Sequence, residues 1–229
     1  MCGRYYSNSD KQTIAERFQL RQLPDVAIAP NYNIAPTTFE PVVRLGRDSG
    51  ERELELMRWG LVPHFAKSLS DFKGFSTFNA RAETLASSAV WRVPFQRRRC
   101  LVPADGFYEW KTLDDSKKPA KRPYAITLAD GKPMAFAGLW DAWKEADGRW
   151  LQSFSIITTE ANELMSTIHT RMPVILHSRD WEEWLDRNDS RPAPTHLLRQ
   201  YESDQMQMAP CNPLVGNVRN NGPEMLEAT

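Results

Sequence analysis

The chain has 229 residues, of which 41% are hydrophobic and 25% are charged, the composition of a folded globular protein rather than of a disordered one. Lysine plus arginine and aspartate plus glutamate number 29 each, so the net charge of zero gives no sign of a nucleic-acid or membrane partner, which must then bind through a local patch. We find no signal peptide and no apolar run of about 18 residues, and we expect an intracellular, cytoplasmic protein without membrane contact.

In chain order, the first predicted element is a helix that begins near Ser9. Ser9 and Gln12 form a capping-box pattern, and Ile14 and Phe18 lie one turn apart on one face of this helix. Strand-forming residues then predict strands over 41–45, 53–58 and 98–102, with a helix over 80–89 between the last two.

Two Asp-Gly pairs in the second half of the chain predict hairpin turns, because glycine adopts positive φ at little cost. The flanking strand-like runs are residues 124–128 and 134–139 around the first pair, and residues 142–143 and 150–158 around the second. We therefore expect an antiparallel meander over this region. Helices follow over 160–168 and 178–185, the second with an apolar stripe of Trp181, Trp184 and Leu185.

The balance of these elements predicts an α+β fold, in which an antiparallel sheet or barrel-like core carries peripheral helices. The sequence has no internal repeat and no linker, so we expect a single domain over residues 1–229 and a monomer. Residues 222–229 are expected to form a flexible tail.

Several kinds of catalytic site are excluded by the motifs that the sequence lacks. It contains no Walker A stretch, no GxGxxG after a strand, no GxSxG and no HExxH. Cys2, Cys100 and Cys211 are widely spaced without a CxxC pair, and the four histidines lack metal-ligand spacing. We expect free thiols, no metal and no cofactor.

Cys2 follows the initiator methionine directly, and Met1 is removed when the second residue is small. The mature chain would then begin with a free α-amine and a thiol on adjacent carbons. An α-amine has a pKa of about 7.7–8.0, so a useful fraction is unprotonated at neutral pH and can attack an aldehyde. The thiol can then close a five-membered thiazolidine ring. The alternative is that Cys2 is merely a small residue in a first strand.

Four stretches place polar residues among apolar ones. Polar groups in such surroundings are costly to bury, so their presence usually has a structural or functional reason. They are residues 31–36 (NYNIAP), 79–83 (NARAE), 104–110 (ADGFYEW) and 168–173 (IHTRMP). Each also has an ordinary structural explanation. Asn79 can cap a helix, Glu109 can pair with Arg81 or Lys111, and His169 can be a hydrogen-bonded core histidine.

Taken in order, these stretches resemble the SRAP family of SOS response-associated peptidases, also called abasic-site processing proteins. The resemblance covers nearly the whole chain, and the ordered set is highly specific. The segments that carry it are residues 1–4 (MCGR), 32–36 (YNIAP), 59–63 (WGLVP), 79–84 (NARAET), 98–110 (RRCLVPADGFYEW), 137–140 (AGLW), 157–159 (ITT), 169–173 (HTRMP) and 215–217 (VGN).

The resemblance implies a DNA-damage protein that forms a covalent crosslink with an abasic site in single-stranded DNA. Ring-opened abasic deoxyribose exposes the aldehyde that the chemistry of Cys2 requires. Cys2 would be the nucleophile, amine first and thiol second, while Asn79 would orient the reacting N-terminus. Glu109 would act as general acid and base, and His169 would assist proton transfer and contact the DNA near the lesion. Strand cleavage by a lyase side reaction is a further expectation.

The resemblance also implies a set of DNA contacts. Phosphates would be held by Arg4 and Arg81, with Arg171 and Thr158 beside them. Asn33 and Pro36 belong to a loop that would shape the pocket. Many family members have a tryptophan soon after the position of Pro63, whereas this chain has His64-Phe65-Ala66, so Phe65 would provide a smaller stacking face. Arg97-Arg98-Arg99 is interpreted as a solvated strand entry in preference to the alternative, a DNA site.

Two other functions remain open from the residues alone. An N-terminal-nucleophile peptidase could use Cys2 with a nearby Glu and His and release Met1 by autoproteolysis. A non-catalytic single-strand DNA-binding module would bind intact and abasic strands alike. Partners at replication forks are not indicated.

Overall fold

Five strands form a closed barrel in the part of the chain that the structure describes. The structure is a computed structural model, and it describes residues 2–23, 25–69, 77–114, 116–117, 119–188 and 191–228. The barrel strands are β3 (Phe39–Leu45), β4 (Arg52–Trp59), β6 (Arg99–Ala104), β9 (Met134–Lys144) and β10 (Trp150–Glu160). They pair in the order β10-β4-β3-β6-β9, and β9 pairs again with β10, so the sheet closes on itself.

The second half of β10 leaves the barrel and carries two short strands. β5 (Asn79–Arg81) pairs with it in parallel, with Asn79 opposite Ile156, and β11 (Arg171–Pro173) pairs antiparallel, with Pro173 opposite Thr158. Three sequence segments that carry predicted site residues therefore meet along one strand.

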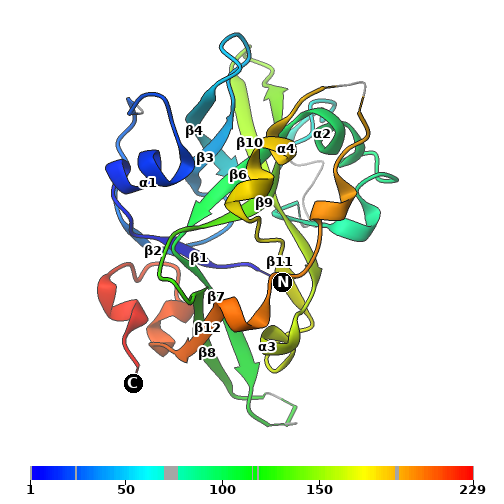
Figure 1. Ribbon diagram of the computed structural model, residues 1–229. Helices are drawn as coiled ribbons and strands as arrows, with labels where there is room; N and C mark the ends of the chain where they lie inside the picture. The colour runs from blue at the N-terminus through cyan, green and yellow to red at the C-terminus, as the bar shows by residue number, and fades with distance from the viewer. Residues whose placement is uncertain are drawn as a thin grey trace.

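A second, antiparallel sheet has the order β12-β8-β7-β1-β2. Its strands are β1 (Tyr5–Ser7), β2 (Asn31–Ile34), β7 (Gly106–Thr112), β8 (Lys121–Leu128) and β12 (Met206–Pro210). Figure 1 shows this sheet below the barrel, with β1 crossing between the two. It sets the N-terminal segment beside the strand that carries Glu109.

The barrel interior is filled by one face of each strand, as the period-two alternation of strands requires. Val42, Cys100, Phe136 and Phe154 are fully buried members of this cluster, which also contains Cys2 and Tyr5. The Tyr5 ring lies 5.1 Å from Trp59 and 5.9 Å from Phe136, both edge to face. The N-terminal segment therefore packs onto one end of the barrel.

Helices cover the outside of the barrel (Figure 1). They are α1 (Lys11–Phe18), α2 (Arg92–Arg97) and α4 (Trp181–Leu185), with a single turn, α3 (Glu163–Ser166), before β11. Phe18 stacks on Trp181 with ring centroids 4.9 Å apart. Short 3-10 turns complete the chain, at Ala82–Thr84, Ser178–Asp180, Thr195–Leu197, Ser203–Gln205, Pro213–Gly216 and Pro223–Leu226.

The predicted α+β class with a barrel-like core is confirmed, and so are the three early strands. The helix near Ser9 is present with Ile14 and Phe18 buried, but its N-cap is Asp10, whose side chain accepts a hydrogen bond from Thr13 N–H. Ser9 instead bonds to the Asp105 carboxylate, which displaces the cap by one residue.

The helix predicted over residues 80–89 is wrong. Residues 79–81 form β5 and only a 3-10 turn follows, because pairing with β10 overrides the local helix propensity. The helix predicted over 160–168 shortens to Glu163–Ser166 for a similar reason, since residues 158–160 pair with β11.

The predicted meander is half right. The second Asp-Gly turn joins β9 and β10, with Gly148 at φ 89° and Trp150 opposite Lys144. The first turn also reverses the chain, with Gly131 at φ 70°, but β8 and β9 enter different sheets. A tight turn therefore fixes the local reversal without fixing which strands pair.

Two further expectations fail on packing. Residues 223–226 of the predicted tail form a 3-10 turn whose Met225 is fully buried in a cluster with Tyr6 and Tyr108. Arg99, expected in a solvated strand entry, is buried and donates to the carbonyls of Trp184, Phe95, Gln96 and Asp186. It ties the end of α4 to the end of α2.

Among the described residues, no helix has both the length and the apolar character needed to span a membrane. In the same residues, no three His, Cys, Asp or Glu side chains gather as metal ligands.

Candidate functional site

Cys2 lies just before β1, at the end of the barrel that β1 covers. Its side chain is fully buried, and Tyr108 N–H donates to the Arg4 carbonyl over 2.9 Å, which continues the β1–β7 pairing towards Cys2. Burial raises the pKa of the Cys2 thiol, and the nearby charge of Glu109 raises it further. The thiol is therefore protonated at neutral pH.

Glu109 lies in the middle of β7, where the alternation of the strand turns it inward. It is only 5% exposed, and burial raises the pKa of its carboxyl to about 7. A carboxyl with a pKa near neutrality can both donate and accept a proton, as general acid-base catalysis requires.

His169 stands between α3 and β11. Its Nδ1 lies 2.9 Å from the main-chain nitrogen of Arg171 and 3.2 Å from the Arg171 carbonyl oxygen, so Nδ1 accepts from the first or donates to the second according to the ring tautomer. Burial lowers the pKa of His169, which keeps the ring neutral at pH 7. The charge of Lys121 acts on both His169 and Glu109, so these two groups share one neighbourhood.

Asn79 opens β5 and is 7% exposed. Its Nδ2 donates to the Phe78 carbonyl over 2.9 Å, while its Oδ1 is buried and accepts no hydrogen bond from any described residue. A buried acceptor without a donor costs free energy, so this oxygen marks a place for a hydrogen-bond donor that is not among those residues.

Arg171, at the start of β11, is held in a fixed orientation. Its guanidinium donates to both carboxylate oxygens of Glu83, over 2.6 and 3.0 Å, and to the Thr158 carbonyl over 2.7 Å. The Thr158 side chain is itself fully buried, whereas Arg81 on the neighbouring strand is exposed. Glu83 was not predicted as a site residue, although its position in the NARAE stretch was the signal that could have identified it.

Arg4 and Asn33 bond to each other and to the C-terminal segment. Arg4 Nη1 donates to Asn33 Oδ1 over 2.6 Å and to the Val215 carbonyl over 2.7 Å. Asn33 Nδ2 contacts the carbonyls of Val215, Asn217 and Asn220 at 3.2, 3.0 and 2.7 Å. Pro36, just after β2, is partly exposed. In this structure the loop is therefore fixed by contacts within the protein.

Phe65 belongs to the segment that follows β4 and is 50% exposed. Its ring lies 5.4 Å from that of His64, whose Nδ1 and main-chain N–H both lie 3.0 Å from Asp141 Oδ2 on β9. Phe65 thus lies half exposed at the side of the barrel wall.

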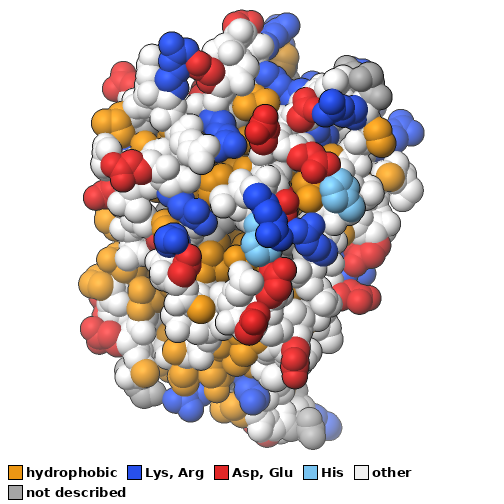
Figure 2. Space-filling view, in the orientation of Figure 1, with side chains coloured by type: hydrophobic (Ala, Val, Ile, Leu, Met, Phe, Trp, Pro, Cys, Tyr) orange, Lys and Arg blue, Asp and Glu red, His pale blue; other side chains and the backbone are white. Residues whose placement is uncertain are grey.

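The predicted residues therefore fall into four groups. Cys2 interacts electrostatically with Glu109, and Glu109 shares the influence of Lys121 with His169. Asn79, Arg81, Thr158 and Arg171 lie on adjacent strands around the second half of β10. Arg4, Asn33 and Pro36 form the loop contact beside β1, and Phe65 lies on the barrel wall. Figure 2 shows basic and acidic side chains interspersed over one face, in keeping with the balanced charge.

Comparison with known proteins gives matches over almost the whole chain. The family model described as SOS response associated peptidase (SRAP) matches residues 1–218. The chain is 40% identical to the abasic site processing protein YoqW of Bacillus subtilis over the full length of both, and 31% identical to the abasic site processing protein HMCES of Rattus norvegicus, over 99% of this chain and 75% of that one.

Solved structures agree on the fold. A crystal structure of a protein from Bacteroides thetaiotaomicron superposes with a TM-score of 0.86 at 25% identity, covering all of both chains. A protein from Bordetella bronchiseptica gives a TM-score of 0.76 at 26% identity, over 92% of this chain and all of that one.

Proposed function

Because this chain belongs to the SOS response associated peptidase (SRAP) family, we propose that it captures abasic sites in single-stranded DNA as a covalent crosslink through Cys2. Relatives across that family are named abasic site processing proteins, which supplies the substrate class. The proposal requires removal of Met1, which frees the α-amine of Cys2.

The amine acts first and the thiol second. The unprotonated amine attacks the C1′ aldehyde of the ring-opened deoxyribose to give a carbinolamine, and loss of one water leaves an imine. The thiol then adds to the imine carbon while its proton passes to nitrogen, which closes a thiazolidine. The raised pKa of the buried Cys2 thiol fits this order, because the thiol is the weaker nucleophile at the start.

Glu109 and His169 divide the proton transfers. Glu109, with its pKa near 7, holds a proton at the start, donates it to the departing hydroxyl of the carbinolamine and recovers the proton that the nitrogen releases as the imine forms. In the tautomer in which Arg171 N–H donates to Nδ1, neutral His169 presents Nε2–H, which donates to the sugar oxygen as the ring opens or to the phosphate beside it. The observation that carries the proposal is the burial of Cys2 beside β7, the strand that holds the buried Glu109 carboxyl.

The remaining residues orient the reactants. Asn79 Oδ1, buried without a partner among the described residues, accepts from the Cys2 amine and directs its lone pair towards the aldehyde. Arg81 and Arg171 hold phosphates on either side of the lesion, with Arg171 preset by Glu83 and Thr158.

The test is a denaturing gel of the purified protein incubated with a single-stranded oligonucleotide that carries one abasic site. A slowly migrating band is expected from the wild type and from Cys211→Ala, whose buried thiol lies outside the site, but not from Cys2→Ala. An equally strong band from folded Cys2→Ala, or no band from the wild type, would overturn the proposal.

A peptidase is less well supported by the same site. A cysteine peptidase needs a thiolate, and the burial of Cys2 favours the protonated thiol instead. A non-catalytic DNA-binding module would give equal reversible affinity for intact and abasic strands, an outcome that the same gel and a binding titration would reveal.

A further inference from the structure

The barrel has a second open end, away from Cys2. A hollow of about 640 Å³ lies there, within the size range of binding sites, and barrel mouths are common places for them. Trp140 on β9 and Arg44 on β3 line it, and they continue the inward faces of Phe136 and Val42. The hollow is therefore the mouth of the barrel itself, and below we call it the barrel mouth.

The distance between the two ends can be estimated along β10. Trp150 lines the barrel mouth, and Thr158, eight residues further on, pairs with β11, whose Met172 belongs to the core cluster of Cys2. At a strand rise of about 3.3 Å per residue, the two ends are roughly 26 Å apart. The barrel mouth is thus separate from the residues proposed to react with the lesion.

The barrel mouth concentrates positive charge in a chain whose net charge is zero. None of the described residues that line it is acidic. Its cations come from four separate segments and are Arg44, Arg47, Arg97, Arg98, Lys144 and Arg187.

Two of these cations form ion pairs with carboxylates of residues that do not line the barrel mouth. Arg44 pairs with Glu53 at 3.0 Å and Arg98 pairs with the buried Asp141. Arg97 and Lys144 are exposed at the rim. Such a concentration of cations attracts a polyanion.

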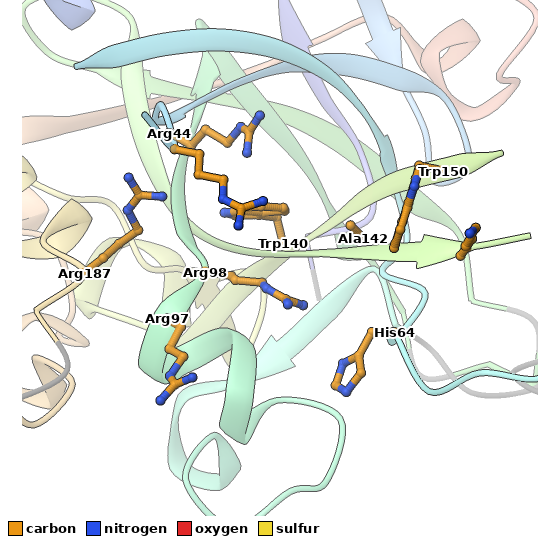
Figure 3. A pocket seen from close by; sticks show the side chains of 10 residues that line it. Arg44, His64, Arg97, Arg98, Trp140, Ala142, Trp150 and Arg187 are labelled. Carbon is orange, nitrogen blue, oxygen red and sulfur yellow. The ribbon is translucent and has the colours of Figure 1, made fainter. Parts of the chain in front are cut away.

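Two tryptophans add flat surfaces between these charges. Figure 3 shows the Arg44 and Arg98 guanidinium groups beside the Trp140 ring, with Arg97 and Arg187 on one side and His64 and Trp150 on the other. The Arg44 guanidinium lies 4.6 Å from the centre of the Trp140 ring. Trp150 is 65% exposed, which is unusual for so large an apolar side chain. Trp140, by contrast, is partly buried beneath the Arg44 and Arg98 guanidinium groups. Cations beside aromatic rings are typical of sites that bind unpaired nucleic acid.

We propose that the barrel mouth binds an unpaired stretch of the same DNA strand, away from the lesion, through its phosphates and stacked bases. This inference rests on the proposed function for the identity of the strand. Phe65 lies on the route of the strand between the two ends of the barrel. Its ring contacts that of His64 at the rim of the barrel mouth, and the segment 59–65 begins at Trp59, which belongs to the same core cluster as Cys2. At about 3.4 Å per stacked nucleotide, the strand needs roughly eight nucleotides to reach from one end to the other.

The expected occupant is single-stranded because a duplex offers its bases only at its ends. Paired bases are already stacked on each other, so Trp140 and Trp150 would gain little from them. An acidic peptide would satisfy the cations but leave both rings unused.

The test measures binding by fluorescence anisotropy for the wild type, Arg97→Glu/Lys144→Glu and Trp150→Ala. The matched control is Lys11→Glu/Arg92→Glu, which makes the same change in charge outside the barrel mouth, with Arg92 on the same helix as Arg97. Each protein is titrated with an intact strand of about 25 nucleotides and with one of about seven, too short to span both ends.

The double charge reversal is expected to weaken binding of the long strand by about tenfold or more. It should also make the slope of the logarithm of the binding constant against the logarithm of the salt concentration shallower by about 1.4, because two phosphate contacts are lost at about 0.7 each. Trp150→Ala should weaken long-strand binding by about fivefold or more. The short strand, which occupies only one end at a time, should lose less affinity than the long strand, and the control variant should show wild-type values.

Four results would overturn the inference. The first is unchanged long-strand affinity in both variants, and the second is an equal loss of affinity in the control variant. The third is displacement of the long strand by a blunt duplex or by polyglutamate as effectively as by an unpaired strand. The fourth is displacement by thymidine monophosphate at the concentration of competing strand phosphate, which would make the barrel mouth a mononucleotide site. The strands carry no lesion, so these results are independent of whether Cys2 forms a crosslink. Circular dichroism checks that each variant is folded, which is expected because all the changed side chains lie at the surface.

Discussion

Nδ1 of His169 faces the main chain of Arg171, 2.9 Å from its nitrogen and 3.2 Å from its carbonyl oxygen, so the backbone engages this ring nitrogen in either neutral tautomer. Burial lowers the pKa of His169, so the neutral form prevails at pH 7. Nε2 is therefore the ring nitrogen that we assign to the reaction.

His169→Gln keeps a hydrogen-bond donor of similar reach but cannot transfer a proton. We expect the crosslinking rate to fall by about 10²-fold while the affinity for an intact strand stays unchanged. Single-turnover gels and a binding titration measure the two quantities, with His196→Gln, exposed and outside the site, as control. A loss of affinity in proportion to the loss of rate would assign His169 to binding alone.

Glu109 should give the crosslinking rate a maximum near neutral pH. The rate rises with pH as the α-amine loses its proton, at a pKa of about 7.7–8.0, and falls as Glu109, with its pKa raised to about 7, loses the proton it must donate. Glu109→Gln should lower the rate by about 10²-fold and abolish the falling limb. Rates measured across this range decide the matter, and a falling limb that persists in the variant would exclude Glu109 as the acid.

The strands and helices that the sequence predicts correctly are those with a strong local signal. The β9–β10 hairpin follows from Asp147-Gly148, and the buried face of α1 follows from the spacing of Ile14 and Phe18. Local signals fail where long-range pairing decides, as in β5, and where an identical turn joins two different sheets, as between β8 and β9.

The same division holds for the site. Cys2, Asn79, Glu109 and His169 could be identified because each belongs to a recognisable stretch. The bidentate contact of Arg171 with Glu83 joins residues 88 positions apart, and no local pattern indicates it. The barrel mouth was unpredictable for the same reason, since Arg44, Arg98 and Trp150 meet only when the barrel closes.

Asn33 is expected to contribute to stability more than to chemistry. Its side-chain amide accepts a hydrogen bond from Arg4 and donates to three carbonyls of the C-terminal segment, and all of these groups lose a partner in Asn33→Ala. The free energy of unfolding should fall by about 3 kcal/mol, because buried polar groups are left unpaired. Urea denaturation measures it. Asn221→Ala, which removes one exposed hydrogen bond to Tyr32 N–H, is the control and should cost under about 1 kcal/mol.

Glu40 should make the protein less stable as the pH rises. Burial raises the pKa of this carboxyl from 4.5 to about 7, so between these values the folded state holds a proton that the unfolded state has released. Stability therefore falls across this window, by on the order of 3 kcal/mol once the pH exceeds 7.

Glu40→Gln removes this dependence. The variant should match the wild type near pH 4.5 and exceed it in stability at pH 8, as thermal unfolding at the two pH values measures. Glu55→Gln, an exposed carboxyl on the neighbouring strand, is the control and should show no such gain. A Glu40→Gln variant that is less stable than the wild type at pH 8 would contradict the account.

Mass spectrometry of the crosslinked N-terminal peptide identifies the linked atoms, on which the proposed crosslink through Cys2 depends most. After digestion of the protein and of the DNA, the peptide should begin at Cys2, lack Met1 and carry the abasic sugar phosphate with the loss of one water. Tandem fragmentation should place the added mass on Cys2. A crosslinked peptide that retains Met1, or that carries the sugar on a lysine or on another cysteine, would contradict the central claim.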